Sequence, residues 1–331
     1  MMRSLLAARL AWSLLAVATM LAGACTSAPD DPEGDLAAAF ERTLADSFSY
    51  RLSVEADRDA LESLGEGAAS ATAFLSTFAV VGTTGADGGQ LRVQVLGTDL
   101  LDVRRLDAEH TYVRLGLTEL PGLPEELADP AALLPALVAL GLGEQVEVAG
   151  ATLLEGGWVL LEGALDAAAL RESSGAGAAS ASETASVDEA LGADTEERIR
   201  RFVEVTEQTE AGARRTFRVS LHLRELVQAV ATLGPAPPGA GTRPGDAAAV
   251  PEVLAGTVFV EDGVVTRIRL DLSALTDDDT AVGQVELQLD LDDHGQARPP
   301  TAPEARTTLS AQALVDALAT LLRFVAGVDL G

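Results

Sequence analysis

Apolar and polar residues alternate one by one along many short stretches of this 331-residue chain. The clearest stretch is residues 284–291, where valine and leucine alternate with glutamine, glutamate and aspartate. Similar or more apolar short runs lie at residues 50–56, 74–81, 91–95, 99–106, 111–117, 158–161, 217–223, 258–260 and 265–272. Because successive side chains of a β-strand point to opposite faces, this pattern predicts strands with one apolar and one polar face.

Turn residues connect several of these predicted strands. Residues 86–89 (ADGG) and 261–263 (EDG) are typical of β-hairpins, in which Gly and Asp adopt backbone conformations that most residues avoid. Connections this short leave no room for a crossover, so we expect neighbouring strands to run antiparallel.

Three other stretches repeat apolar residues every three or four positions, which predicts helices at residues 35–45, 130–140 and 310–326. In the first, Leu36 and Phe40 share a face, and we expect Asp35 to cap the N-terminus. A sheet with one apolar face needs a cover, which amphipathic helices supply. We therefore predict an α+β fold: a curved antiparallel β-sheet (a half-barrel) with helices packed on its concave face.

We expect a single domain of this kind over residues 35–331. Two segments within it, near residues 173–193 and 234–245, are low in complexity and rich in Gly, Ala, Ser and Pro. Such segments bury little apolar surface, so we predict that they are exposed, mobile insertions.

The N-terminus has the features of an export signal over residues 1–24. Two arginines precede an apolar run that is too short to cross a bilayer core. Residues 21–24 (LAGA) then lead into Cys25, the only cysteine. This resembles a lipobox, at which bacteria attach diacylglycerol to the thiol and cleave before it, although Ala22 stands where lipoboxes usually carry Leu. The alternative is an ordinary secretory signal followed by a chance cysteine.

On the lipobox interpretation, Cys25 anchors the mature protein in the cell membrane, on its extracytoplasmic face. Residues 25–34 are polar, acidic and contain Pro and Gly, so we predict a flexible tether there.

Composition narrows the possible functions. Asp and Glu number 51 against 23 basic residues, all of them arginine, for a net charge of −28. Nucleic-acid binding is excluded as a function because phosphate backbones require a basic surface. Only 4% of the residues are aromatic, which predicts a largely aliphatic core.

Catalytic and metal-binding motifs are missing from the sequence. Without lysine, Schiff-base chemistry is excluded, and neither a nucleophile elbow nor a phosphate-binding glycine loop occurs. The three histidines are scattered, and the acidic stretches at 277–279 and 290–295 do not complete a calcium loop, so we interpret them as solvated turns. We therefore predict no cofactor, no metal and no enzymatic activity.

Other conspicuous side chains have structural interpretations. We expect Trp158 to lie in the core. Arg104, Arg105 and Arg114 fall on neighbouring predicted strands, where pairing with Asp102 or Glu109 on a wet sheet face is the favoured interpretation. The alternative is that these arginines bind an anionic headgroup at the rim of a cavity.

Several stretches resemble one family. Residues 101–106 followed by 110–114 (HTYVR), the hairpin at 260–268, and residues 292–295 (DDHG) with Ala302-Pro303 occur in that order. Together they are similar to actinobacterial lipoproteins of the LppX/LprG type, whose fold is like that of the carriers LolA and LolB. The likeness covers roughly residues 36–305, and the two insertions and the predicted C-terminal helix depart from it. The resemblance implies a half-barrel sheet with a hydrophobic cavity that carries lipid or lipoglycan across the envelope.

Two functions follow as alternatives. The leading one is non-enzymatic binding or transport of a lipid or other hydrophobic ligand by a membrane-anchored lipoprotein. The other is a structural or adaptor lipoprotein of an envelope complex, with a packed core and no ligand. For the first, the candidate ligand-binding residues are those on the apolar strand faces: Leu52, Val54, Val93, Val219, Leu221, Leu270, Val285, Leu287 and Leu289.

Overall fold

A computed structural model describes residues 31–56, 77–86, 88–116, 144–163, 194–232, 251–273, 285–310 and 313. The predicted export signal, Cys25, the helix at 130–140, both insertions and the acidic stretch at 277–279 lie outside the described residues. So does nearly all of the helix predicted at 310–326.

The described chain forms two compact units, each assembled from separate parts of the sequence. Unit 1 contains residues 31–56, 77, 194–232, 251–273 and 285–296. Unit 2 contains residues 78–86, 88–116, 144–163, 297–310 and 313. The single domain expected over residues 35–331 stays a prediction.

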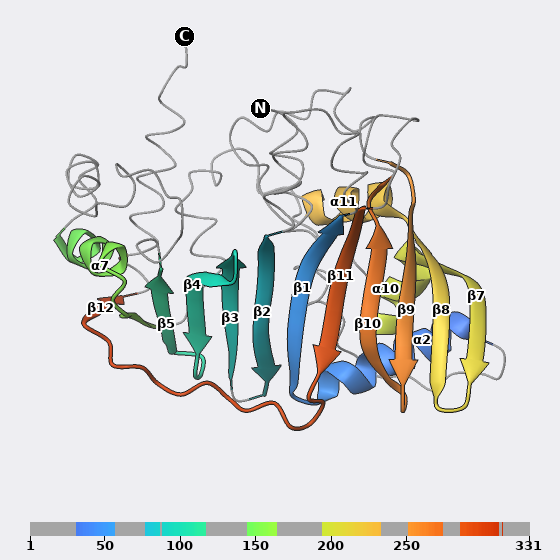
Figure 1. Cartoon of the computed structure of the whole chain (residues 1–331), viewed down its shortest axis with the longest axis horizontal. Coiled ribbons are helices and arrows are strands. Elements are labelled where there is room, and N and C mark those ends of the chain that lie inside the picture. The colour runs from blue at the N-terminus through green and yellow to red at the C-terminus, as the bar shows by residue number, and fades with distance from the viewer. Residues whose placement is uncertain are drawn as a thin grey trace, which may run out of the picture. The chain divides into compact units, whose positions relative to one another are not determined.

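The described part of unit 1 contains an antiparallel sheet of six strands, whose arrangement is shown in Figure 1. Their spatial order is β1 (Phe48–Ala56), β11 (Val285–Asp292), β10 (Val264–Asp271), β9 (Leu254–Glu261), β8 (Arg214–Leu221) and β7 (Val203–Ala211). The alternating stretches therefore form strands as predicted, and β1 is paired with β11 from the far end of the chain. The β9–β10 hairpin turns at Asp262 and Gly263, whose φ angles of 53° and 81° explain the EDG signal.

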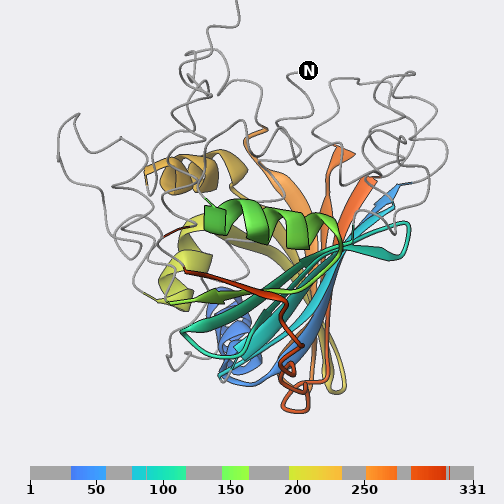
Figure 2. The same ribbon diagram turned by 90° about the vertical axis from the view of Figure 1, so that its left-hand side faces the viewer.

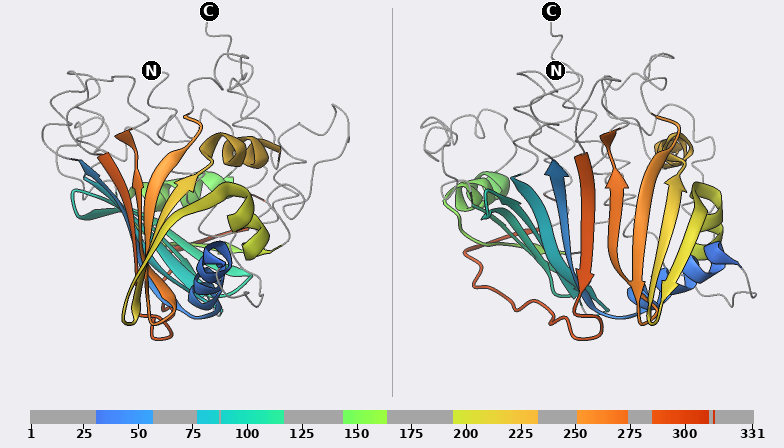
Figure 3. Two further views of the ribbon diagram at one scale, coloured as in Figure 1. Left: turned by 90° about the vertical axis from the view of Figure 1, so that its right-hand side faces the viewer. Right: turned by 45° about the vertical axis from the view of Figure 1, so that its right-hand side comes forward.

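Three helices cover one face of this sheet (Figure 3, left): α2 (Pro32–Ala45), α10 (Thr195–Phe202) and α11 (Leu223–Thr232). The prediction that Asp35 caps α2, and that the tether extends to residue 34, is wrong. Asp31 is the cap, and its Oδ1 accepts a hydrogen bond from the Gly34 N–H at 3.0 Å. Pro32 suits the first helical turn because its fixed φ matches the helix and that turn needs no N–H donor. Asp35 instead pairs with Arg215 at 3.0 Å.

The core of unit 1 lies between these helices and the sheet. Leu36 and Phe40 of α2 pack on Phe217, Val258 and Val260, which come from the facing strands. The predicted aliphatic core is therefore only partly correct, because four of the eight phenylalanines are buried in this unit: Phe40, Phe48, Phe202 and Phe217. A chain with few aromatic residues can still concentrate them in one core.

A β-bulge adapts β10 to helix α2. The register shifts between Val265 and Arg267, so an extra residue is inserted opposite β9. The shift keeps Val265 on the helix-covered face, where its side chain is fully buried. Its backbone N–H then donates to Oγ1 of Thr43 in α2 at 2.8 Å.

The described part of unit 2 contains six strands and one helix, and Figure 2 views it from its own side. The strand order is β2 (Phe78–Gly85), β3 (Gly88–Val95), β4 (Thr98–Arg105), β5 (His110–Leu115), β6 (Val159–Glu162) and β12 (Thr307–Ser310), and the helix is α7 (Glu144–Leu154). Strands β2 to β5 form the antiparallel meander predicted from the short turns, and β6 pairs antiparallel with β5 after a long connection that contains α7. The expectation that all strands are antiparallel is wrong for β12, which runs parallel to β6 because the chain returns to this edge from unit 1.

Helix α7 packs on β5, β6 and β12 through a small apolar cluster that contains Ala149, Val159, Leu161 and Leu309. In both units, helices cover one face of an antiparallel or mixed sheet, which confirms the predicted α+β class. None of the described helices is both long and apolar enough to span a membrane.

Candidate functional site

Eight of the nine candidate ligand-binding residues share the helix-covered face of the unit 1 sheet. Strand register places them there: Leu287 of β11 opposes Val54 of β1 on one side and Leu270 of β10 on the other. The eight are Leu52, Val54, Val219, Leu221, Leu270, Val285, Leu287 and Leu289. The alternating pattern therefore identified a common surface on strands that are far apart in the sequence.

Helices fill the space above this surface. Leu287 is 8% exposed and belongs to a cluster with Leu223 and Leu226 of α11. Gly256 also reflects close packing, because a Cβ at this position would lie 2.7 Å from Cδ2 of Leu270 and 2.9 Å from a backbone oxygen. Within the described residues, this face is a packed core.

Val93 is the ninth candidate and lies in unit 2, on β3. It opposes Val80 on β2 and Leu101 on β4, while Leu91 opposes Val103. We call Leu91, Val93, Leu101 and Val103 the apolar strip; each is half-buried. The strip lies on the same sheet face as α7, since Val103 opposes Val113, which packs on the α7 cluster.

The apolar strip differs from the unit 1 face in what covers it. Helix α7 lies over β5, β6 and β12, and none of the hydrophobic clusters formed by the described residues contains a strip residue. Sequence reasoning selected only Val93. The other three strip residues, Leu91, Leu101 and Val103, also lie on predicted strands, and their register with Val93 is the signal that would have found them.

The opposite face of the unit 2 sheet carries a polar network. Asp102 is 4% exposed and accepts hydrogen bonds from Nη2 of Arg104 at 3.0 Å and from Nε2 of Gln90 at 2.9 Å. The Arg104 guanidinium also lies 4.6 Å above the ring of Trp158. The predicted pairing of Arg104 with Asp102 is confirmed. The prediction that Trp158 is a core residue is wrong: it is half-buried, because it lies against Arg104 instead of beneath α7.

The remaining arginines of that predicted group bind backbone oxygens. Arg105 donates from Nε to the Asp107 carbonyl at 3.2 Å, and Arg114 donates from Nε to the Gly156 carbonyl at 3.1 Å. These bonds join strands to neighbouring loops, whereas the predicted partners of both residues were Asp102 or Glu109.

The histidines have different surroundings. Nδ1 of His110 is 2.9 Å from Oδ1 of Asp107, and His294 lies against the ring of Phe48, with 6.2 Å between ring centroids. The pKa of Asp107 is held below its ordinary value by the backbone N–H of Glu109 and, next, by the His110 side chain. In the part of the chain that the structure describes, no three His, Cys, Asp or Glu side chains are grouped to hold a metal ion.

Comparison with known proteins adds a likeness in structure. Neither a family model nor a curated protein sequence matches this chain. Among solved structures, lipoprotein LppX from Mycobacterium tuberculosis aligns at 9% identity and a TM-score of 0.33, covering 82% of this chain and 97% of that protein. LprF from Mycobacterium bovis aligns at 11% identity and a TM-score of 0.33, covering 81% and 95%. The chain is similar to these mycobacterial lipoproteins, the type that its sequence motifs resemble.

Proposed function

We propose that this protein is a membrane-anchored, extracytoplasmic lipoprotein that binds or transports a lipid or other hydrophobic ligand and catalyses no reaction. The observation that carries the proposal is the apolar strip. Its four valine and leucine side chains are half-buried and belong to none of the described core clusters. An apolar ligand laid along them would bury their remaining apolar surface.

The chemistry of the strip suits an acyl chain. Its members lie in register on two adjacent strands, β3 and β4, so they form a continuous aliphatic surface without a charged side chain between them. Burying one methylene is worth about 0.8 kcal/mol, so an acyl chain gains affinity from length alone and needs few polar contacts. Lipidation of Cys25 would keep the strip close to the membrane that supplies such chains.

Binding of a fluorescent stearate analogue to residues 26–331, which lack the signal and the lipidated cysteine, tests this proposal. We expect Val93→Glu to weaken probe binding at least tenfold, because a carboxylate on the strip must be desolvated by the bound chain. Leu160→Glu is the matched control, since Leu160 is a half-buried aliphatic residue on the opposite face of the same sheet. The control should bind within twofold of wild type. Absence of saturable binding by the wild-type protein would refute the carrier function.

The adaptor function has an observation of its own. The unit 1 face, which holds eight of the candidate residues, is covered by α2, α10 and α11. If no lipid is found by mass spectrometry of extracts from the purified protein and the probe does not bind, a packed lipoprotein acting through its outer surface is the better proposal.

A further inference from the structure

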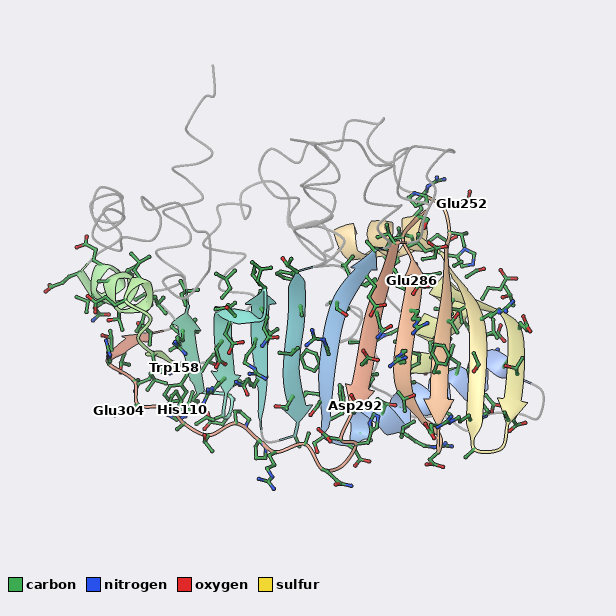
Figure 4. All side chains as sticks on the ribbon, in the orientation of Figure 1. His110, Trp158, Glu252, Glu286, Asp292 and Glu304 are labelled. Carbon is green, nitrogen blue, oxygen red and sulfur yellow. The ribbon has the colours of Figure 1, made fainter. Side chains whose placement is uncertain are left out.

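The polar face of the unit 1 sheet carries three neighbouring arginines. Arg51 of β1 and Arg267 of β10 oppose Asp290 of β11 from its two sides, and Arg269 follows on β10, opposite Gln288. This face is turned towards the viewer in Figure 4, where Glu286 and Asp292 mark two levels of β11. In a chain with 51 acidic and 23 basic residues, three arginines around one carboxylate are a local excess of positive charge.

Two of these guanidinium groups are held in place from one side. Nε of Arg267 donates to Oδ1 of Asp290 at 2.6 Å, and Nε of Arg269 donates to Oε1 of Gln288 at 3.1 Å. The acceptors are themselves fixed, because Gln288 is 7% exposed and its Nε2 donates to Oδ2 of Asp290 at 2.8 Å. Arg269 also lies 5.8 Å above the ring of Phe259. These contacts use only Nε, and within the described residues both pairs of Nη atoms make no hydrogen bond.

Arg51 is the third member, and its side chain is exposed. Among the described residues it forms no hydrogen bond and no ion pair, although Asp290 lies opposite on the next strand. Both oxygens of Asp290 are already occupied by Arg267 and Gln288. The three arginines and one aspartate therefore carry a net charge of about +2 at neutral pH, with guanidinium donors left over.

A row of acidic side chains lies on the same three strands, beyond the arginines. Glu55, Glu286 and Asp271 lie side by side on β1, β11 and β10, two residues from Arg269 and four residues from Arg51 and Arg267. Like charges in directly opposed positions destabilise a sheet. No described residue forms an ion pair with any of the three. Arg269 is about 7 Å from this row along the strand, the rise of two residues, and Arg51 and Arg267 are about twice as far.

We propose that Arg51, Arg267 and Arg269 form a phosphate-binding site, and that the acidic row makes the site prefer phosphate esters that carry an ammonium group. A guanidinium matches two oxygens of a phosphate with two parallel N–H donors, and the free Nη pairs of Arg267 and Arg269 provide that geometry. The ammonium of a ligand such as phosphoethanolamine would then lie towards Glu55 and Glu286. The inference is independent of the acyl ligand proposed above, because it concerns another unit and a polar face.

The test is a calorimetric titration of the full-length chain, in a neutral maltoside detergent at low salt, with inorganic phosphate and with O-phosphoethanolamine. Low salt is needed because exposed charge pairs are screened at higher ionic strength. We expect saturable binding of both ligands, with O-phosphoethanolamine the tighter. Arg51→Gln should weaken both ligands roughly tenfold, as loss of a charge-assisted partner does, whereas Arg51→Lys should recover part of the loss.

Two further variants separate a built site from general electrostatics. Arg214→Gln removes the same charge from β8, where the Arg214 side chain is 74% exposed and paired with Glu261, and it should leave both affinities unchanged. Glu286→Gln should abolish the preference for O-phosphoethanolamine without weakening inorganic phosphate. The proposal is overturned if neither ligand binds, or if Arg214→Gln weakens binding as much as Arg51→Gln. Equal affinity of the wild-type protein for the two ligands would overturn the preference. Weaker binding of inorganic phosphate by Glu286→Gln would contradict the assigned role of the acidic row.

Discussion

The Val265 N–H donates to Oγ1 of Thr43 at 2.8 Å, joining helix α2 to strand β10 across 222 residues of sequence. Both residues are buried, and the Thr43 hydroxyl donates in turn to the Ala39 carbonyl at 2.8 Å. The bulge in β10 places Val265 before the point where β10 begins to pair with β11, so a helix side chain supplies the acceptor. One hydroxyl therefore connects helix α2 to a strand from the C-terminal third of the chain.

Removing that hydroxyl should destabilise unit 1. In Thr43→Ala the Val265 N–H stays buried without an acceptor, which costs about 1–3 kcal/mol of unfolding free energy. Thr43→Ser is the control, because it keeps the oxygen and loses only a methyl group. Urea unfolding followed by circular dichroism measures both. Equal losses in the two variants would show that the hydroxyl contributes nothing.

Tyr50 makes the fold sensitive to alkaline pH. Burial raises the pKa of its phenol from 10.0 to about 12. Between these values the unfolded chain loses the proton while the folded chain retains it, so ionisation favours unfolding and stability falls as pH rises through this window. Below pH 10 the group is neutral in both states and has no such effect. We expect Tyr50→Phe to lose less stability than wild type between pH 10 and 12, measured as unfolding midpoints; parallel curves would contradict the assignment.

Two leucine truncations should distinguish the packed face from the apolar strip. Leu287→Ala leaves a cavity beneath α11 and should cost about 2–5 kcal/mol of unfolding free energy. Leu101→Ala makes the same chemical change at a half-buried strip position and should cost less than half as much. The order reverses for ligand binding, since only Leu101→Ala should weaken binding of the fluorescent stearate analogue. A larger loss of stability for Leu101→Ala than for Leu287→Ala would mean that the strip is part of a packed core.

Membrane attachment should depend on Cys25. Two acyl chains contribute about 0.8 kcal/mol per buried methylene, which is enough for stable anchoring where a single chain is marginal. Cys25→Ala should therefore block processing at this site and lipidation, as seen in the mass of the N-terminal peptide. Cys25→Ser tests the thiol itself with a smaller change in size and should behave in the same way. Recovery of wild-type protein with a free Cys25 thiol would refute lipidation.

The strands were predictable because their faces differ in polarity. β11 alternates strictly, and the apolar positions of β1, β10 and β8 match it across the sheet. Strand β7 was missed because it is an edge strand whose residues are nearly all exposed. Neither of its faces has to be apolar, so its apolar and polar residues alternate little. β12 was missed because four residues are too few to show a period.

The helices were harder to predict. α10 has a readable start, where Asp194 Oδ1 accepts from the Glu197 N–H at 2.8 Å, but it spans only eight residues. α7 contains β-branched residues and a glycine, which obscure the helical period. Their positions in the fold depend on contacts with sheet residues that are distant in sequence.

The candidate site could be predicted only as a set of apolar faces. Leu287 and Val93 occupy equivalent positions in alternating patterns, and nothing local distinguishes them. The difference arises from the helices: α11 lies over Leu287, whereas α7 lies over strands beyond Val93. The arginine row on the polar face needed the register of β1, β11 and β10, because Arg51 is more than two hundred residues from Arg267 and Arg269.

The pairing of β1 with β11 limits the order in which the sheet can form during synthesis. About 230 residues separate the end of β1 from the start of β11, which a ribosome takes roughly 10–50 s to translate. The β2–β5 meander consists of local hairpins that close in microseconds, so it can form long before β11 is available to pair with β1. Until β11 emerges, the edge of β1 that will pair with it has unpaired backbone groups and can pair with other chains. We therefore expect the yield of this protein to depend on chaperones that shield nascent strands more than its final stability suggests.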